Sequence, residues 1–430
     1  MRPPTLSSFV LLCGAMGMVT VSLSALGTLV PLYAVREGAS ATVIGILVAL
    51  PNVFPVMLAL VAGRLVDAGG AGRAFVVGTA GMVLAPLLVT LVSGLGALAL
   101  GQVLIGLFHL FVTLASQSFV ADLSNGRSFE RNFSWYSTSL AAGRMVGPVL
   151  VGLIVDLAGF RAAFAVLTMI ALFTLTLAVA ARRAAAATAP LVPGAAATPG
   201  PDAHASPTVE GAPRSAGRDR APASTAQGAD MRDLLVNPGV QLAILASSGV
   251  FVAIAVRQAF FPVYLQSLDH PASTIGALLS LGAFAAVLVR PLMPLVSRLF
   301  GGPARTLVVA MAAVAVSVGL LGTVQTLLPL VALTMLAGFG TGVGMPLSIV
   351  SVATHVVPAR RGVALALRLS ANRTAQLVAP VAIGALVGAA GFGAGFALAG
   401  GLLAVATVAA MVRVPAFERA ARTGRARADV

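Results

Sequence analysis

The sequence predicts an all-α membrane protein with twelve transmembrane helices in two six-helix bundles. Three observations predict this class: the composition is strongly apolar, the apolar residues fall in long runs, and the runs form two groups of six. Of the 430 residues, 58% are hydrophobic and 9% are charged, whereas a soluble domain carries roughly 25% charged residues. A water-soluble fold of this composition would expose large apolar patches and aggregate. The composition therefore excludes a soluble enzyme.

The apolar runs give the order of the helices. A helix needs about 20 apolar residues to cross the hydrocarbon layer. Such runs occupy approximately 8–34, 41–61, 74–92, 97–120, 132–155 and 162–181, and then 240–267, 274–296, 306–324, 327–351, 363–388 and 393–412. We therefore divide the chain into a first bundle (1–183), a cytoplasmic linker (184–235), a second bundle (236–414) and a basic cytoplasmic tail (415–430). The linker is rich in Ala, Pro, Thr and Gly, a composition that predicts disorder.

Positive charge predicts the orientation in the membrane. All 27 basic residues are arginine, and the formal net charge is +14. Twenty arginines lie in the ends, the linker and the loops of one side, five lie within spans, and only Arg36 and Arg161 lie on the opposite side. The side with the arginine excess is expected to be cytoplasmic. We therefore expect a multi-pass protein of the cell (inner) membrane with both termini in the cytoplasm, and no nucleic-acid partner.

The first apolar run is longer than that of a cleavable signal peptide, which usually spans roughly 7–15 residues. Cys13 is the single cysteine. It lies inside this run, where it is expected to pack as a small hydrophobic residue.

The two halves repeat each other. An offset of 231 residues aligns Pro31-Leu-Tyr33 with Pro262-Val-Tyr264, and aligns the segment 41–50 with 272–281 at five identities in ten. An offset of 232 aligns the pairs Gly106 and Gly338, Pro148 and Pro380, Gly152 and Gly384, Gly159-Phe160 and Gly391-Phe392, and Arg73 and Arg305. Six spans in each half give both halves the same orientation, as in parallel repeats whose interface holds a central site.

The loop between the second and third spans carries a recognisable motif, Gly63-Arg-Leu-Val-Asp67-Ala-Gly-Gly70-Ala-Gly-Arg73. It resembles the cytoplasmic loop signature of the major facilitator superfamily, and the resemblance extends over essentially the whole chain outside the linker. The family's Arg after the Asp is Ala68 here, and its final basic pair is reduced to Arg73, one place late. In the family this loop stabilises the outward-facing packing of the halves, so the resemblance implies that Asp67 acts in a conformational latch.

The fifth span contains a second motif, Gly143-Arg-Met-Val-Gly147-Pro148-Val-Leu-Val-Gly152. It resembles a signature associated with exporters and antiporters of the superfamily, although its last element has one Gly where the family usually has two. Glycines four residues apart let helices approach closely, and a proline permits a kink. On the fourth span the family often has an Arg, linked to proton coupling, where this chain has Gln102.

Three arginines lie near the middle of the predicted spans: Arg144, Arg257 and Arg373. None of the 13 acidic residues does. A guanidinium group keeps its proton and must be compensated, either by an anionic or zwitterionic substrate or by helix carbonyl oxygens. Arg290 and Arg368 lie nearer the cytoplasmic ends, where they could extend toward water, and we expect both to be structural.

Further candidate substrate ligands are polar. A stripe at helical spacing on the fourth span contains Gln102, His109, Thr113 and Gln117, and Gln258, Asn372 and Gln376 accompany the arginines. In the superfamily the first, fourth, seventh and tenth spans line the central path. His109 could carry a coupling proton, or it could bond to a neighbouring helix.

The leading hypothesis is a secondary-active exporter of a small organic molecule, working by alternating access and by proton antiport. The alternatives are an uptake symporter for an anionic nutrient, and a membrane-embedded enzyme or transport-inactive sensor. We expect no enzyme activity, metal or cofactor, because the sequence has no metal-ligand spacing, no paired carboxylates within the bilayer and no phosphate loop. The expected partners are a small-molecule substrate, protons and the lipid bilayer, and the protein is expected to be a monomer.

Overall fold

A computed structural model describes residues 4–124, 129–187, 234–356 and 358–428, and these residues form helices and no β-strand. In the first half the helices are α1 (Pro4–Arg36), α2 (Ala41–Ala49), the 3₁₀ turn η1 (Leu50–Asn52), α3 (Val53–Gly69), α4 (Ala71–Leu91), α5 (Leu95–Asp122) and α6 (Phe129–Ala186). In the second half they are α8 (Pro238–Ser267), α9 (Ala272–Leu288), α10 (Met293–Leu299), α11 (Pro303–Leu320), η2 (Leu321–Thr323), α12 (Leu327–His355) and α13 (Pro358–Ala428). The all-α class is confirmed.

Nine helices among the described residues are long and apolar enough to cross a membrane, or ten if the bent pair α9–α10 is one span. Two of the nine are longer than one crossing needs. α6 has 58 residues and α13 has 71, and each is broken by a glycine with non-helical backbone, Gly159 (φ 79°) and Gly391 (φ 82°). Positive φ favours glycine, which explains why these aligned glycines mark both breaks. The count of twelve spans stays a prediction.

Prolines interrupt two of the predicted spans. The span predicted at 41–61 consists of α2, η1 and the start of α3, and the 3₁₀ turn contains Pro51, which has no N–H to donate. The span predicted at 274–296 ends as α9 at Leu288, and α10 leaves it at an angle of 78°. Pro291 lies in this break and disfavours helical backbone at the residue before it.

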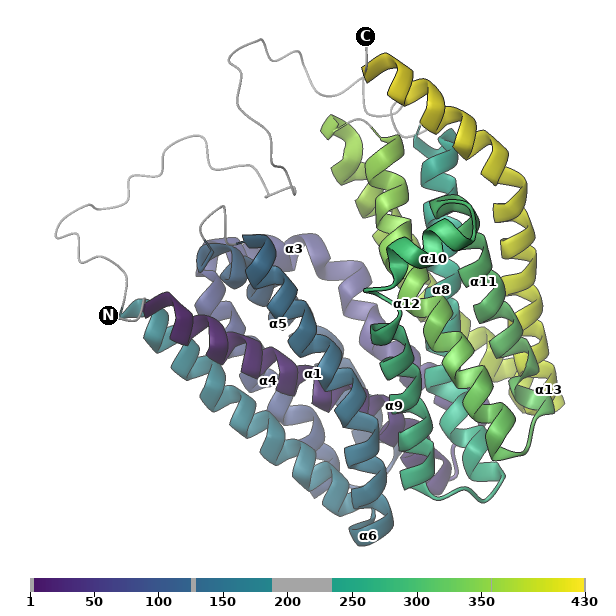
Figure 1. Ribbon diagram of the computed structural model, residues 1–430. Helices are drawn as coiled ribbons and strands as arrows, with labels where there is room; N and C mark the ends of the chain where they lie inside the picture. Colours follow the sequence, from purple (N-terminus) through teal and green to yellow (C-terminus); the bar gives the residue numbers. More distant parts are fainter. Residues whose placement is uncertain (1–3, 125–128, 188–233, 357, 429–430) are drawn as a thin grey trace.

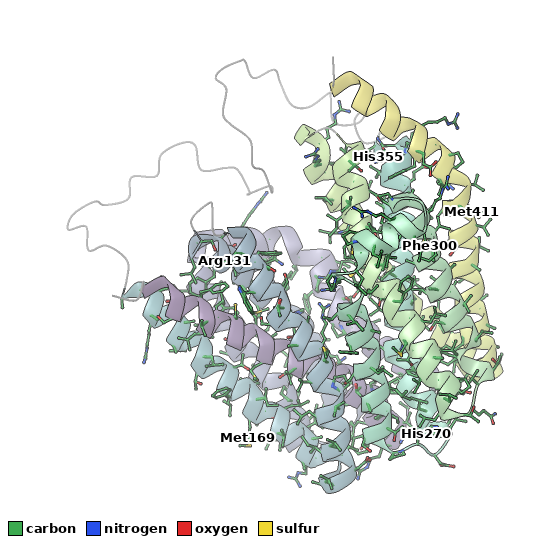
Figure 2. All side chains as sticks on the ribbon, in the orientation of Figure 1. Arg131, Met169, His270, Phe300, His355 and Met411 are labelled. Atoms are coloured by element: carbon green, nitrogen blue, oxygen red, sulfur yellow. The ribbon has the colours of Figure 1, made fainter. Side chains whose placement is uncertain are left out.

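The helices form two groups, one from each half of the sequence (Figure 1). The groups touch at the end that carries the turns between α1 and α2 and between α8 and α9, and they diverge toward the end that carries the start of α8 and the end of α13. Arg131 and His355 lie at the diverging end on opposite halves, and His270 lies at the closed end (Figure 2).

One core cluster contains residues of both halves, among them Tyr33, Phe164, Phe260 and Phe396, and three further clusters lie within single halves. Large apolar side chains also cover the outside of the molecule. Met169 is 68% exposed and Met411 is 65% exposed, on the outer faces of the two halves (Figure 2). An apolar outer surface of this extent requires lipid around it.

The structure describes little of the predicted linker and most of the predicted tail. Most of the linker predicted at 184–235, residues 188–233, lies outside the described residues. Leu234 is buried in a cluster with residues of α8, α12 and α13. The tail predicted at 415–430 continues α13 as helix to Ala428.

Candidate functional site

Two helix pairs close one end of the space between the halves: α2 against α13, and α6 against α9. In the first pair, a Cβ atom added to Gly45 would overlap the backbone carbonyl oxygen of Pro380. In the second pair, a Cβ atom added to Gly276 would overlap the carbonyl oxygen of Pro148. Each contact therefore requires a glycine. Since Gly45 aligns with Gly276 and Pro148 with Pro380, the two contacts are related by the internal repeat.

Each helix pair has a further close contact, through a second glycine one turn along. A Cβ atom added to Gly152 of α6 would overlap the carbonyl oxygen of Ala272, and a Cβ atom added to Gly384 of α13 would lie 2.7 Å from the carbonyl oxygen of Ala41. The hydroxyl of Thr42 also donates to the Gly384 carbonyl oxygen at 3.5 Å. At the closed end, the halves thus meet backbone to backbone.

One carboxylate joins the halves at this end. Asp156 on α6 accepts hydrogen bonds from the backbone N–H groups of Ala272 (2.9 Å) and Ser273 (2.8 Å). These groups are the free donors at the N-terminus of α9, which carries partial positive charge. Asp156 therefore caps a helix of the opposite half. The cap was not predicted from the sequence, because Asp156 and Ala272 are 116 residues apart.

The aromatic residues of the repeat form matching clusters. The Tyr33 ring lies 5.7 Å from that of Phe160 and 5.3 Å from that of Phe164. The Tyr264 ring lies 5.6 Å from that of Phe392 and 5.7 Å from that of Phe396. Each cluster fixes the first helix of its half against the helix that follows the glycine break.

The exporter-like motif of α6 divides between two interfaces. Gly143 and Gly147 face α1 of the same half, where an added Cβ would overlap atoms of Thr20 and Ser24, and the Ser24 hydroxyl donates to the Gly143 carbonyl oxygen at 3.0 Å. Only the part with Pro148 and Gly152 reaches the other half. Gly143 and Gly147 therefore shape the contact of α6 with α1 and not the contact between the halves, because atoms of α1 lie where their side chains would be.

The loop motif forms the tight connection between α3 and α4. Gly70 has φ 81° and lies between the two helices, while Gly63 lies in α3 and Arg73 is an exposed residue of α4. The side chain of Asp67 lies outside the described part of the structure. The aligned Arg305 forms an ion pair with Glu418 at 3.1 Å.

The stripe on α5 mixes packing contacts with accessible groups. Gln102 is buried and donates to the Leu47 carbonyl oxygen at 3.1 Å, next to the break in the second span. The Gln102 side chain therefore joins α5 to α2. Nε2 of His109 lies 3.1 Å from the hydroxyl oxygen of Thr113, and Gln117 is exposed.

Two of the three mid-span arginines come together with His109. Arg144 on α6 and Arg373 on α13 both lie within electrostatic range of His109 on α5. Nη1 of Arg373 also lies 3.5 Å from Oδ1 of Asn52, and donates to this atom of the opposite half. Arg144 is exposed although it lies in mid-span. No described carboxylate lies within ion-pair distance of either arginine.

Arg257 lies elsewhere, within the second half. Its guanidinium group lies 5.3 Å from the ring centroid of Phe261, and Nη2 lies 3.6 Å from the Cβ position of Gly282 on α9. The neighbouring Gln258 is exposed and fills the space over Gly27 on α1. The structure therefore brings Gln258, but not Arg257, to the contact between the halves.

Arg368 and Asn372 are buried, with 4% and 1% of their surfaces exposed. Nη1 of Arg368 donates to the Ser348 hydroxyl on α12 at 2.8 Å. Oδ1 of Asn372 accepts from Ser248 on α8 at 3.4 Å, and its backbone oxygen accepts from Gln376 at 3.3 Å. Arg368 thus bonds within its own half and does not extend toward water. Helix periodicity alone could have placed Arg368 and Asn372 on one face.

A family model described as Major Facilitator Superfamily matches residues 12–320 and 247–429, which together cover nearly the whole chain. The chain belongs to the major facilitator superfamily. No curated protein matches it. Among solved structures, a bacterial homologue of the human lysosomal transporter Spinster, in an inward-facing and unoccupied conformation, gives a TM-score of 0.71 at 12% identity over 99% of both chains.

Two further solved structures are similar to this superfamily member. A mutant of the peptide transporter POT gives a TM-score of 0.73 at 14% identity, over 96% of this chain and 95% of that one. A mutant of the nucleoside transporter NupG gives 0.69 at 15% identity, over 95% and 99%. At these identities the likeness shows the fold. This chain is a multi-pass membrane protein and a secondary transporter of small molecules, not an enzyme.

Proposed function

We propose that this transporter carries a small organic anion, which binds between the halves at Arg144 and Arg373. The observation that supports this most strongly is that two guanidinium groups, one from each half, lie within electrostatic range of His109 with no described carboxylate beside them. Arginine binds carboxylate through two parallel hydrogen bonds. An anion held by both groups would supply the negative charge that both lack and would link the two halves during alternating access.

The substrate class is tested with purified protein. A panel of carboxylates and a matched panel of amines is screened for thermal stabilisation. Carboxylates are expected to stabilise the wild-type protein, and the variants Arg144→Met and Arg373→Met are expected to lose that effect. Arg298→Met is the matched control, because Arg298 is exposed at the last turn of α10. Equal stabilisation by amines, or full carboxylate binding in both variants, contradicts the proposal.

We propose export, in exchange for protons, as the direction of transport. The support is the resemblance of the segment 143–152 to exporters, with Pro148 and Gly152 in the contact between the halves. Liposomes with the protein in one orientation test the direction. Efflux of the anion from the side of the termini, driven by protons entering there, agrees with export. Accumulation on that side shows uptake.

One observation favours a second candidate, a proton symporter. His109 lies within electrostatic range of two arginines, and an anion bound to them would place a negative charge near its ring. Anion and proton therefore favour each other at this site, which is the requirement for carrying them together. An imposed proton gradient separates the mechanisms, because symport moves the anion along with the protons and antiport moves it against them.

We further propose that the diverging end of the molecule faces the cytoplasm, which makes this an inward-facing state of an inner-membrane protein. Arg131 lies at this end (Figure 2), and the sequence predicts Arg64, Arg73, Arg298 and Arg360 on the same side of the membrane as Arg131, in agreement with the positive-inside rule. A reporter that is active only outside the cytoplasm, fused after Val430, is expected to be inactive. An active reporter reverses the assignment.

A further inference from the structure

The second half contains a buried positive charge whose hydrogen-bonding capacity is only partly used. Arg368 is 4% exposed, and Ser348 accepts from its Nη1. Its Nε–H is buried and has no hydrogen-bond partner in the part of the chain that the structure describes. The Ser348 hydroxyl donates its own proton to the Met345 carbonyl oxygen at 2.7 Å, so Ser348 brings no charge that could balance the guanidinium group.

A second unused donor lies one helical turn away. Asn372 is 1% exposed, and its Nδ2 is also buried without a described partner. Residues four apart on a helix have Cβ atoms roughly 5–6 Å apart on one face. Arg368 and Asn372 therefore present two free N–H donors to the same side of α13, the side that packs against Ser248 of α8 and Ser348 of α12.

An isolated charge in a low-dielectric interior costs several kcal/mol unless an opposite charge or strong hydrogen bonds compensate it. No described carboxylate lies within ion-pair distance of Arg368. A water molecule would accept hydrogen bonds from both donors but would carry no charge. The group that satisfies the donors and the charge together is an anion.

We propose that Arg368 and Asn372, supported by Ser348, form a binding site for a small monovalent anion such as chloride inside the second half. The site is separate from the substrate site. Arg373 follows Asn372 directly, but its side chain reaches Asn52 of the opposite half. α13 thus presents one face to the anion and another to the substrate, and this proposal does not depend on the transported molecule.

The experiment measures thermal unfolding of the full chain, purified in detergent with gluconate as the only anion, while chloride is titrated. Gluconate is the comparison ion because it is much larger than chloride. Chloride is expected to raise the melting temperature of the wild-type protein by a few degrees with saturation, as a ligand of the native state does. Arg368→Met is expected to remove this rise. Arg373→Met is expected to keep it, which separates the site from the carboxylate site.

A further variant decides the matter even if Arg368→Met does not fold. Asn372→Asp places a carboxylate one turn from Arg368, where it supplies the missing negative charge within the chain. In gluconate this variant is expected to reach the melting temperature that the wild-type protein reaches in chloride, and added chloride is expected to have no effect. In Asn372→Ala the charge of Arg368 remains but the amide donor is lost. This variant is therefore expected to need a higher chloride concentration for the same rise in melting temperature.

Three results overturn the proposal: no difference between chloride and gluconate in the wild-type protein, an unchanged chloride response in Arg368→Met, or an unchanged chloride response in Asn372→Asp. To distinguish chloride from the carboxylate of a substrate, the titration is repeated with the carboxylate that stabilises the protein best. If this carboxylate stabilises Arg373→Met and fails to stabilise Arg368→Met, Arg368 and Asn372 bind substrate and not chloride.

Discussion

A guanidinium group stays charged at any depth in a bilayer, so the groups around it must compensate the charge. Four arginines of this chain have different surroundings. Arg257 lies over the Phe261 ring, Arg368 bonds to a serine, and Arg373 reaches an asparagine of the other half. Arg144 remains exposed in mid-span. These surroundings, more than depth in the membrane, separate the arginines that can bind a substrate from those that pack.

Replacing Arg373 by Met is expected to raise the KM for the transported anion about tenfold or more, because a hydrogen bond between charged groups contributes roughly 1.5–3 kcal/mol. Arg257→Met is expected to leave KM near the wild-type value, because Arg257 packs within the second half. Initial rates of uptake into proteoliposomes measure both. A larger rise in KM for Arg257→Met than for Arg373→Met would show that Arg257, and not Arg373, binds the transported anion.

The candidate residues were only partly predictable. His109, Thr113, Arg144 and Arg373 were found as polar groups within apolar runs, and the structure places them in helices with His109 within electrostatic range of both arginines. Spacing along one helix cannot say which neighbouring helix a side chain meets. For this reason the sequence did not separate Gln102, which bonds to Leu47, from the accessible Gln117, and it did not separate Arg257 from Arg373.

At the scale of the element, the N-terminus of α9 is stabilised by a residue of the opposite half, whereas α2 begins on its own cap. Ser40 accepts from the Val43 N–H at 3.4 Å, while Asp156 accepts from Ala272 and Ser273. The repeat aligns Asp156 with Gly388, which has no side chain. One of the two closed contacts therefore carries a charge and the other does not.

Asp156→Ala is expected to open the closed end more often. Removing a helix cap costs about 1 kcal/mol, which changes the ratio of closed to open molecules roughly fivefold. Spin labels on α6 and α9 at this end measure the distance distribution. Glu37→Gln removes an exposed acidic group after α1 and is the matched control. An unchanged distribution in Asp156→Ala would show that the cap does not hold the halves together.

The elements themselves followed from local rules with two exceptions. The glycines at 159 and 391 were aligned by the repeat, and both break a helix. The breaks at Pro51 and Pro291 were not predicted, because prolines also occur within unbroken helices, as Pro31 does in α1. The 3₁₀ turn forms where Gly106 of α5 packs against the Pro51 carbonyl oxygen, a contact that only the folded chain reveals.

At the scale of the whole molecule, the halves meet where glycine lies against a backbone carbonyl oxygen. Gly45→Ala is expected to disfavour the closed end, because its methyl group meets the carbonyl of Pro380, which cannot turn aside as a flexible side chain can. Gly401→Ala is the control, since nothing lies within 4 Å of its Cβ position. Cross-linking between cysteines on α2 and α13 measures closure. Equal cross-linking in both variants would contradict the expectation.

The pairing of Gly45 with Pro380 and of Gly276 with Pro148 has a thermodynamic consequence. Two rigid bodies joined at two points cannot separate at one point without straining the other, so both contacts belong to a single cooperative equilibrium. A methyl group that opens one contact therefore already removes most of the stabilisation that the other contact contributes. The combined change Gly45→Ala with Gly276→Ala should therefore cost less than the sum of its parts, and the shortfall in a double-mutant cycle measures how stiffly each bundle moves as one body.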